Sequence, residues 1–133
     1  MEPKTQQERF SIVKRAKSFS HAGRGVWIFV KTTHNAWIHI AVFIIAIGLG
    51  IYFSIDVTEW MLLLLAAGIV LLTEAVNTAI EIDIDLTSAE YHPYARDTKD
   101  VAAGAVLIAA CIAALVGFFI FGKHILLFVQ SVL

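Results

Sequence analysis

The sequence has little of what a small soluble or secreted domain depends on. It contains one cysteine in 133 residues, so no disulfide can form within the chain. Only 16% of its residues are charged, whereas 59% are hydrophobic. A soluble domain of this length cannot bury so much apolar surface inside itself, but a bilayer can accept it. The composition therefore excludes a disulfide-stapled domain and predicts an integral membrane protein.

Basic residues are scarce beyond Asn35, because seven of the ten lysines and arginines precede it. Two of the remaining three, Arg96 and Lys99, adjoin a loop predicted at residues 87–95. The turn predicted at 54–59 carries acidic residues and no cation. Cytoplasmic loops of membrane proteins are enriched in Lys and Arg. We therefore expect a multi-pass protein of the inner (cytoplasmic) membrane, with its N-terminus and second loop in the cytoplasm.

Three apolar runs, at residues 36–54, 59–86 and 98–122, are long enough to span a bilayer, which takes ~20 helical residues. Residues 1–34 are largely polar and basic, with aromatic residues interspersed. We expect them to be cytoplasmic and to include an amphipathic helix in the membrane interface. The apolar tail 124–133 is too short to span and is expected to lie on the membrane surface. The predicted fold is a single all-α membrane domain over 1–133, with one interfacial and three transmembrane helices.

A stripe of polar residues interrupts the second apolar run. Glu74, Asn77, Glu81 and Asp85 follow the spacing i, i+3, i+7, i+11, so an α-helix places them on one narrow face. Carboxylates inside a membrane helix are costly and mark a functional site, unless they are neutralised in a polar seam between helices. Glu74 lies deepest, and Asp85 is expected to reach the cytoplasmic interface. These four residues are the acid stripe.

A cation follows the acid stripe across the next loop. Lys99, with Asp100 beside it, opens the third apolar helix close to the end of the stripe. Carboxylates that hold Mg²⁺, together with a lysine for phosphate oxygens, suit phosphoryl transfer. The base in such a reaction has to lie at the acceptor hydroxyl, and Glu74 is the deepest carboxylate. The residues therefore favour transfer of phosphate from a soluble nucleotide to an alcohol dissolved in lipid.

Several motifs around the acid stripe occur together at characteristic separations. They are Glu-Ala-Val-Asn-Thr-Ala-Ile-Glu at 74–81, Asp85, Glu90-Tyr91-His92-Pro93 and Lys99-Asp100. In this respect the chain resembles the prokaryotic diacylglycerol kinase and undecaprenol kinase family, densely over 73–109 and more loosely over 18–39. Those proteins are small integral-membrane lipid kinases with a surface helix and three spans, assembled as homotrimers with sites between subunits. The resemblance implies ATP- and Mg²⁺-dependent phosphorylation of a membrane lipid alcohol, either diacylglycerol or undecaprenol.

The resemblance also implies a role for each matching residue. Glu74 matches the general base on the lipid hydroxyl, Glu81 matches a metal ligand, and Asp85 falls on a further acidic position of the motif. The residues implied in nucleotide binding are Asn77, Glu90, Tyr91, His92, Lys99 and Asp100. The implied ligands and partners are ATP, Mg²⁺, the lipid alcohol, the membrane and further copies of this chain, with no nucleic acid.

One position departs from the family pattern. Thr33 occupies the place of a Glu that is expected to complete the metal site. A hydroxyl is a weaker Mg²⁺ ligand than a carboxylate, and the imidazole of the adjacent His34 is softer than Mg²⁺ prefers. A degenerate pseudokinase that binds nucleotide therefore stays open as an alternative to a kinase. A second alternative, which depends on the acid within the membrane and not on Thr33, is a small proton-coupled transporter with Glu74 as its coupling acid.

Three further features are interpreted structurally. His39, on an apolar helix, is expected to be packed and hydrogen-bonded. Small residues recur every four positions over 105–117 and predict a close contact between helices. The run 117–124 resembles the start of a phosphate-binding P-loop, but it follows a helix and ends in His where Mg²⁺ requires Ser or Thr. We therefore reject a P-loop there.

Overall fold

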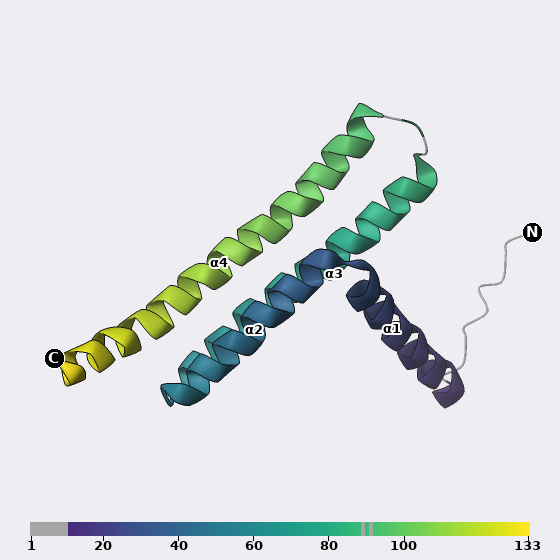
Figure 1. Ribbon diagram of the computed structural model, residues 1–133. Coiled ribbons are helices and arrows are strands. Elements are labelled where there is room, and N and C mark those ends of the chain that lie inside the picture. Colours follow the sequence, from purple (N-terminus) through teal and green to yellow (C-terminus); the bar gives the residue numbers. More distant parts are fainter. Residues whose placement is uncertain (1–10, 89, 91) are drawn as a thin grey trace, which may run out of the picture.

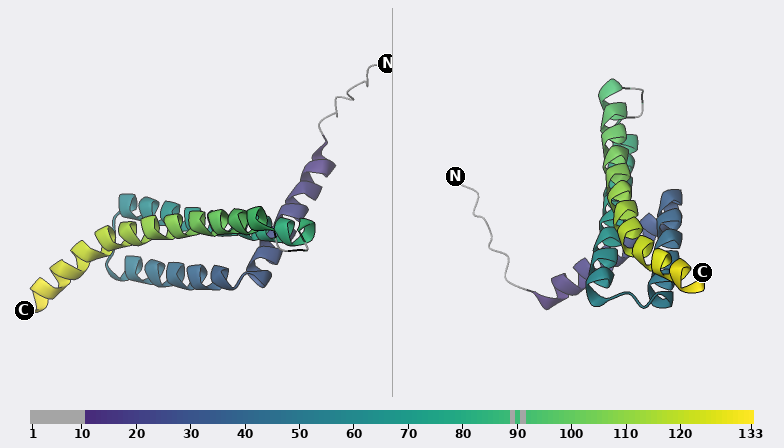
Figure 2. Two further views of the ribbon diagram at one scale, coloured as in Figure 1. Left: turned by 90° about the horizontal axis from the view of Figure 1, so that it is seen from above. Right: turned by 90° about the vertical axis from the view of Figure 1, so that its left-hand side faces the viewer.

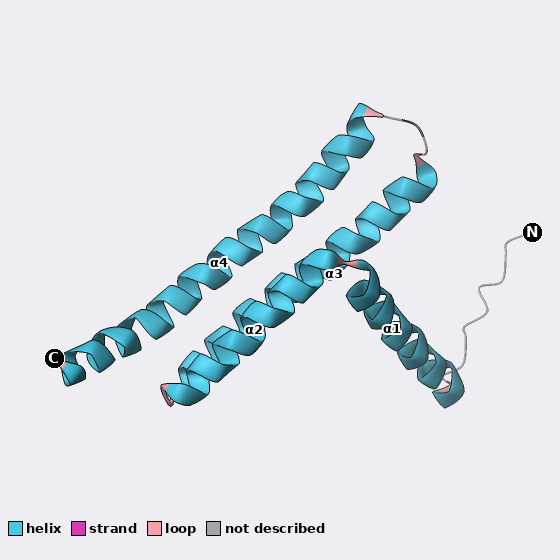
Figure 3. Cartoon of the chain, in the orientation of Figure 1, coloured by secondary structure: helices cyan, strands magenta, loops and turns pink. Residues whose placement is uncertain are grey.

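The computed structural model describes residues 11–88, 90 and 92–133, which form four helices (Figure 1). In chain order these are α1 (Ile12–Thr32), α2 (His34–Tyr52), α3 (Val57–Thr87) and α4 (Pro93–Val132). The described part of the chain contains helices and connecting loops but no strand (Figure 3). Helices α2, α3 and α4 are each long and apolar enough to cross a membrane. The expected all-α class with three candidate membrane spans is therefore confirmed.

Helices α1 and α2 are separated by a single residue. Thr33 adopts an extended backbone with φ −99° and ψ 108°, and its N–H donates to the carbonyl of Phe29 at 3.1 Å. This residue ends α1 and starts α2 in a new direction, so that α1 projects away from the other three helices (Figures 1 and 2). None of the residues of α1 is buried.

The turn between α2 and α3 is held by a reciprocal cap. Ser54 has a φ of +50°, which reverses the chain after α2. The Asp56 carboxylate accepts from the N–H groups of Thr58 (2.7 Å) and Glu59 (3.0 Å). In return, the Glu59 carboxylate accepts from the Asp56 N–H at 3.0 Å. This capping box satisfies N–H groups that the first turn of a helix otherwise leaves without partners.

The apolar core lies beside this turn, at one end of the α2–α4 bundle. Its buried members are Ile55, Leu63, Ile120 and Phe121, and Ala46, Phe53, Trp60 and Val116 pack against them. The core therefore joins α2, α3 and α4 at the end of the molecule opposite the α3–α4 loop.

An ionic cluster also ties α3 to α4 at that end. Glu59 is 7% exposed and forms an ion pair with Lys123. His124 Nε2 lies 3.1 Å from the second oxygen of the same carboxylate. The run that resembled a P-loop in sequence thus ends in two side chains that bind a carboxylate of α3.

Helix α4 is longer than the span predicted at 98–122. It has 40 residues and is therefore about 60 Å long, roughly twice the ~30 Å thickness of the hydrocarbon core. The tail from residue 124, expected to be separate, continues the helix instead as far as Val132. Lys123 and His124 do not end the helix because their polar side chains leave the backbone hydrogen bonds intact. The segments predicted at 36–54 and 59–86 lie within or close to α2 and α3.

Candidate functional site

The acid stripe follows one face of α3, with burial that decreases toward the end of the helix. Glu74 is 1% exposed and Asn77 is 6% exposed. Glu81 is half-buried and Asp85 is exposed. The stripe therefore leads from the interior of the bundle to its surface beside the α3–α4 loop.

Two polar atoms in the buried part of the stripe have no hydrogen-bond partner. They are Oε1 of Glu74 and Oδ1 of Asn77, which have no such partner within the described part of the chain. The amide nitrogen of Asn77 donates to Glu81 Oε1 at 3.1 Å, so the amide group is oriented by the next turn of the same helix. A buried oxygen that is left without a partner costs free energy, and such atoms commonly bind water, an ion or a ligand. The buried part of the acid stripe is therefore suited to binding a ligand.

A cavity of about 290 Å³ lies between α3 and the junction of α1 with α2. We name it the junction cavity. Its lining comprises Thr32, Thr33, His34, Asn35, Glu74, Asn77, Thr78, Glu81, Ile82 and Asp85. All four residues of the acid stripe are among them, so the stripe forms one wall of a polar recess.

A second cavity, of about 340 Å³, lies on the side of the stripe that faces α4. We name it the helix cavity. It shares Asn35, Glu74, Asn77 and Glu81 with the junction cavity, and its other lining residues are Ile38, His39, Ala103, Val106, Leu107 and Ala110. The buried carboxylate of Glu74 thus lines both cavities.

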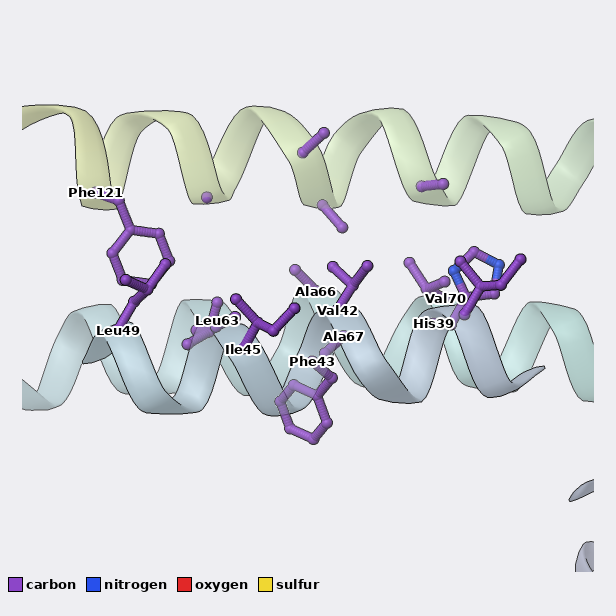
Figure 4. A pocket seen from close by; sticks show the side chains of 16 residues that line it. His39, Val42, Phe43, Ile45, Leu49, Leu63, Ala66, Ala67, Val70 and Phe121 are labelled. Carbon is purple, nitrogen blue, oxygen red and sulfur yellow. The ribbon is translucent and has the colours of Figure 1, made fainter. Parts of the chain in front are cut away.

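An apolar groove of about 460 Å³ runs along α2, α3 and α4 (Figure 4). It extends from Ile38 and His39 toward Leu49 and Phe121, near the α2–α3 turn. Ile38, His39 and Ala110 line both this groove and the helix cavity. A hydrophobic chain in the groove would therefore bring its end next to the acid stripe.

Thr33 is connected to the acid stripe by a short chain of hydroxyl groups. Its Oγ1 lies 2.8 Å from Oγ1 of Thr78. The Thr78 hydroxyl donates to the Glu74 carbonyl at 2.9 Å, so the proton between the two threonines comes from Thr33. The position where the family pattern expects Glu therefore lies at the candidate site.

Lys99 and Asp85 form an ion pair that joins the start of α4 to the end of the acid stripe. Asp100, next to Lys99, is exposed and lies 4.0 Å from the guanidinium of Arg96. Asp100 lines neither polar cavity. Within one chain, Lys99 therefore contacts the acid stripe through Asp85, whereas Asp100 pairs with Arg96 instead.

The motif at residues 90–92 also lies apart from the stripe. Glu90 is exposed, and its carbonyl accepts from the Ser88 hydroxyl at 3.2 Å. His92 caps α4 and its ring centroid is 5.6 Å from that of Tyr94. Neither Glu90 nor His92 lines the polar cavities, and the prediction for Tyr91 falls outside the described residues.

The donor set of the stripe fits Mg²⁺ that arrives with a phosphate ligand. Among residues 11–88, 90 and 92–133, no three His, Cys, Asp or Glu side chains cluster closely enough to hold a metal ion. Mg²⁺, however, usually takes one or two carboxylates and completes its shell with water and substrate phosphates. Glu81 and Asp85 are one helical turn apart in the junction cavity and supply such a partial set. The Asn77 oxygen, which has no partner, is a further donor.

Three residues of the site were not assigned to it from the sequence. Asn35 and His39 are one turn apart at the start of α2, and both line the helix cavity. Thr78 follows Glu74 by one turn and connects it to Thr33. The spacing of four residues was visible in each case, but only the packing of α2 against α3 identifies the face that is turned to the stripe.

The sequence of this chain is similar to those of several known proteins. A family model described as prokaryotic diacylglycerol kinase matches residues 20–121. An undecaprenol kinase of Bacillus subtilis (strain 168) is 40% identical over 105 residues, which cover 79% of this chain and 85% of that protein. A diacylglycerol kinase of Helicobacter pylori (strain J99) is 30% identical over 124 residues, covering 88% and 94%. One of Escherichia coli (strain K12) is 29% identical over 101 residues, covering 71% and 83%. The chain therefore belongs to the prokaryotic diacylglycerol kinase family, a family of membrane lipid kinases.

Proposed function

We propose that this chain phosphorylates a membrane lipid alcohol with ATP and Mg²⁺. The acceptor is diacylglycerol, which becomes phosphatidic acid, or undecaprenol, which becomes its phosphate. The observation that carries the proposal is the position of the Glu74 carboxylate. It is 1% exposed, has an oxygen without a partner and lines both polar cavities, one of which adjoins an apolar groove.

Glu74 is the proposed general base. Its carboxylate takes the proton of the acceptor hydroxyl as the alcohol oxygen bonds to the γ-phosphorus of ATP. The bond from that phosphorus to the bridging oxygen breaks, and ADP leaves with the electron pair. The products are the lipid phosphate, ADP and a proton, which Glu74 releases to water through the junction cavity. Positioned general bases contribute about 10²–10⁴-fold to the rate of such reactions.

Glu81 is the proposed metal ligand, with Asp85 as a further acidic group at the exposed end of the stripe. When bound, Mg²⁺ would neutralise charge on the β- and γ-phosphates of the nucleotide. Lys99 already pairs with Asp85, so its ammonium group is held where a soluble nucleotide can reach it. The proposed nucleotide-binding residues are Asn77, Glu90, Tyr91, His92, Lys99 and Asp100.

We propose that the nucleotide site is completed between subunits of a homotrimer. Support comes from Glu90, His92 and Asp100, which line neither polar cavity of a single chain. Large apolar side chains of α2, α3 and α4 are also widely exposed, among them Val42, Leu65 and Leu107 at 59%, 63% and 66%. Lipid and neighbouring subunits together would cover this surface.

The proposed orientation places α1 and the acid stripe on the cytoplasmic side of the inner membrane. The concentration of cations before Asn35 supports it, as do Arg96 and Lys99 beside the α3–α4 loop. Helix α1 has no buried residue, and it exposes Phe19 and Trp27 among basic side chains. This is the composition of a helix that lies in the membrane interface, as part of a single lipid kinase domain over residues 1–133.

The proposal is tested by a lipid kinase assay on the full chain in detergent or in vesicles. Radiolabelled γ-phosphate from ATP is followed into undecaprenol and into dioleoylglycerol, each with and without Mg²⁺. Glu74→Gln keeps the size of the side chain but cannot take a proton, and it should lower kcat by about a hundredfold to ten-thousandfold. The matched control is Asp83→Asn, which changes an exposed acid on the same helix that lines neither polar cavity. Full activity of the Glu74 variant would remove this residue from the mechanism.

A nucleotide-binding pseudokinase is the second candidate, favoured by the hydroxyl of Thr33 where the family pattern expects a carboxylate. It would be selected by Mg²⁺-ATP binding to the wild-type chain without a phosphorylated product from either lipid. A proton-coupled transporter would instead move a substrate across vesicles without consuming ATP.

A further inference from the structure

His39 lies on α2 without a polar partner. Its side chain is half-buried, yet it makes no hydrogen bond or ion pair with another residue of the described chain. The expectation that His39 is packed and hydrogen-bonded is therefore wrong in its second part. In Figure 4 the imidazole projects from α2 beside Val70, toward the space below α4.

His39 lies where the apolar groove meets the helix cavity. It is the one polar side chain among the sixteen described residues that line the apolar groove. It also lines the helix cavity, together with Glu74, Asn77 and Glu81. Moving along the groove toward the acid stripe, a bound chain would therefore encounter the imidazole before the carboxylates.

A ligand in the groove would leave the imidazole of His39 in need of a new partner. Its ring nitrogens are not among the buried polar atoms without a partner, so water can reach them while the groove is open. When an apolar chain fills the groove, the imidazole loses this water, and the cost is recovered only when it finds another partner. Neighbouring apolar residues of the groove, such as Val42 and Val70, cannot supply one. Asn35, one turn earlier, is not bonded to it either. The missing partner is therefore expected to be a polar group carried by the molecule that occupies the groove.

We propose that His39 binds the oxygen at the polar end of the acceptor lipid and so selects an alcohol with a long apolar chain. The chain lies in the apolar groove, and an imidazole N–H donates to an oxygen of the head. In a polyprenol that oxygen is the hydroxyl itself, and in a diacylglycerol it is the hydroxyl or the adjacent ester carbonyl. This inference rests on the proposed function, to which it adds a residue that holds the acceptor in front of Glu74.

The test compares His39→Leu, which fills the space with an apolar group, with His39→Gln, which restores an N–H donor. The KM for the lipid and the KM for ATP are measured separately with undecaprenol and with dioleoylglycerol. His39→Leu should raise the KM for the preferred lipid about tenfold and leave the KM for ATP unchanged. His39→Gln should recover most of the loss. The matched control is His21→Leu, an exposed histidine of α1 that lines none of the three recesses and should behave as wild type.

Equal effects of the Leu and Gln variants on the lipid KM, or an unchanged lipid KM in both, would overturn the proposal. A parallel rise in the KM for ATP would do the same, since it would indicate general disruption of the site. Binding is also measured without turnover, with a photoreactive polyprenol that carries its label beside the hydroxyl. It should label α2 in the wild type and much less in His39→Leu. If the wild type were inactive but its labelling still depended on His39, the kinase proposal alone would be overturned. If the wild type and His39→Leu were labelled equally, the proposal that His39 binds the lipid would be overturned.

Discussion

The hydroxyl groups of Thr33 and Thr78 are 2.8 Å apart, although 45 residues separate them in the chain. This contact connects the one-residue break between α1 and α2 to the turn of α3 that follows Glu74. It also places residue 33 in the wall of the junction cavity, opposite the acid stripe. Helix α1 is thereby held at the candidate site through a position where the family pattern expects a carboxylate.

Thr33→Glu is expected to strengthen metal binding. The new carboxylate would enter a cavity already lined by Glu81 and Asp85, and so would add a charged oxygen to an incomplete set of Mg²⁺ ligands. The Mg²⁺ concentration for half-maximal lipid phosphorylation should fall about tenfold, equivalent to ~1.4 kcal/mol of binding free energy. Activity at saturating Mg²⁺ should change much less. An unchanged Mg²⁺ titration would mean that the further ligand comes from elsewhere, such as a neighbouring subunit.

Thr78→Val is expected to loosen the junction. The substitution preserves shape but removes the hydroxyl that bonds to Thr33 and to the Glu74 carbonyl. Loss of these bonds should lower the free energy of unfolding by about 1–2 kcal/mol, measured by thermal unfolding in detergent. Thr87→Val is the matched control, because its exposed hydroxyl also donates to the carbonyl four residues earlier but makes no hydrogen bond to another helix of the described chain. Equal destabilisation by both variants would show that the contact with Thr33 contributes nothing.

Periodicity and hydropathy were sufficient to predict the membrane class and the acid stripe. The length of the apolar runs indicates the membrane class, and a period of 3.6 residues places the four residues of the stripe on one face of a helix. The contact face of α4 was harder to predict. Of the predicted small-residue row, Ala109 is buried and Ala113 and Gly117 are half-buried, whereas Ala105 is exposed. The other buried residues in the first half of α4, Ala102 and Val106, lie outside that row. Which row packs depends on the position of α3, and no local pattern encodes that position.

Contacts between distant segments were likewise hidden from the sequence. Nothing near Thr33 indicates Thr78 as its partner, and nothing near His39 indicates that its ring lies at the end of a groove. The same holds for Glu59 and His124, which are 65 residues apart in the sequence. Glu59 lies in the first turn of α3, whereas His124 lies toward the C-terminal end of α4. Each of these pairs depends on how helices are placed side by side, so the sequence yields the residue types but not the pairing.

Gly50→Ala is expected to destabilise the end of the bundle that lies away from the acid stripe. A Cβ at this position would lie 2.8 Å from Cη2 of Trp60 and 3.0 Å from Cδ1 of Ile55. Relieving such contacts in a packed core costs about 1–3 kcal/mol of unfolding free energy. Gly48→Ala is the control on the same helix, since the added atom would have no described heavy atom within 4 Å apart from its chain neighbours and the adjoining helix backbone. It should be neutral or stabilising by up to ~1 kcal/mol. If Gly50→Ala proved as stable as Gly48→Ala in thermal unfolding, α2 would not approach Trp60 so closely.

Glu59→Gln is expected to weaken the connection between α3 and α4 without affecting the chemistry of the site. The substitution leaves Lys123 and His124 without their anionic partner, whereas an amide oxygen at position 59 can still accept from the Asp56 N–H. The unfolding temperature should fall. The decrease should shrink at high ionic strength, because the Lys123 side chain is 53% exposed and its charge is screened by salt. The double variant Glu59→Gln, Lys123→Met should then be destabilised by less than the sum of the two single variants, because either change alone already breaks the ion pair. Strictly additive effects in this double-mutant cycle would show that the two side chains do not interact in the membrane-embedded protein.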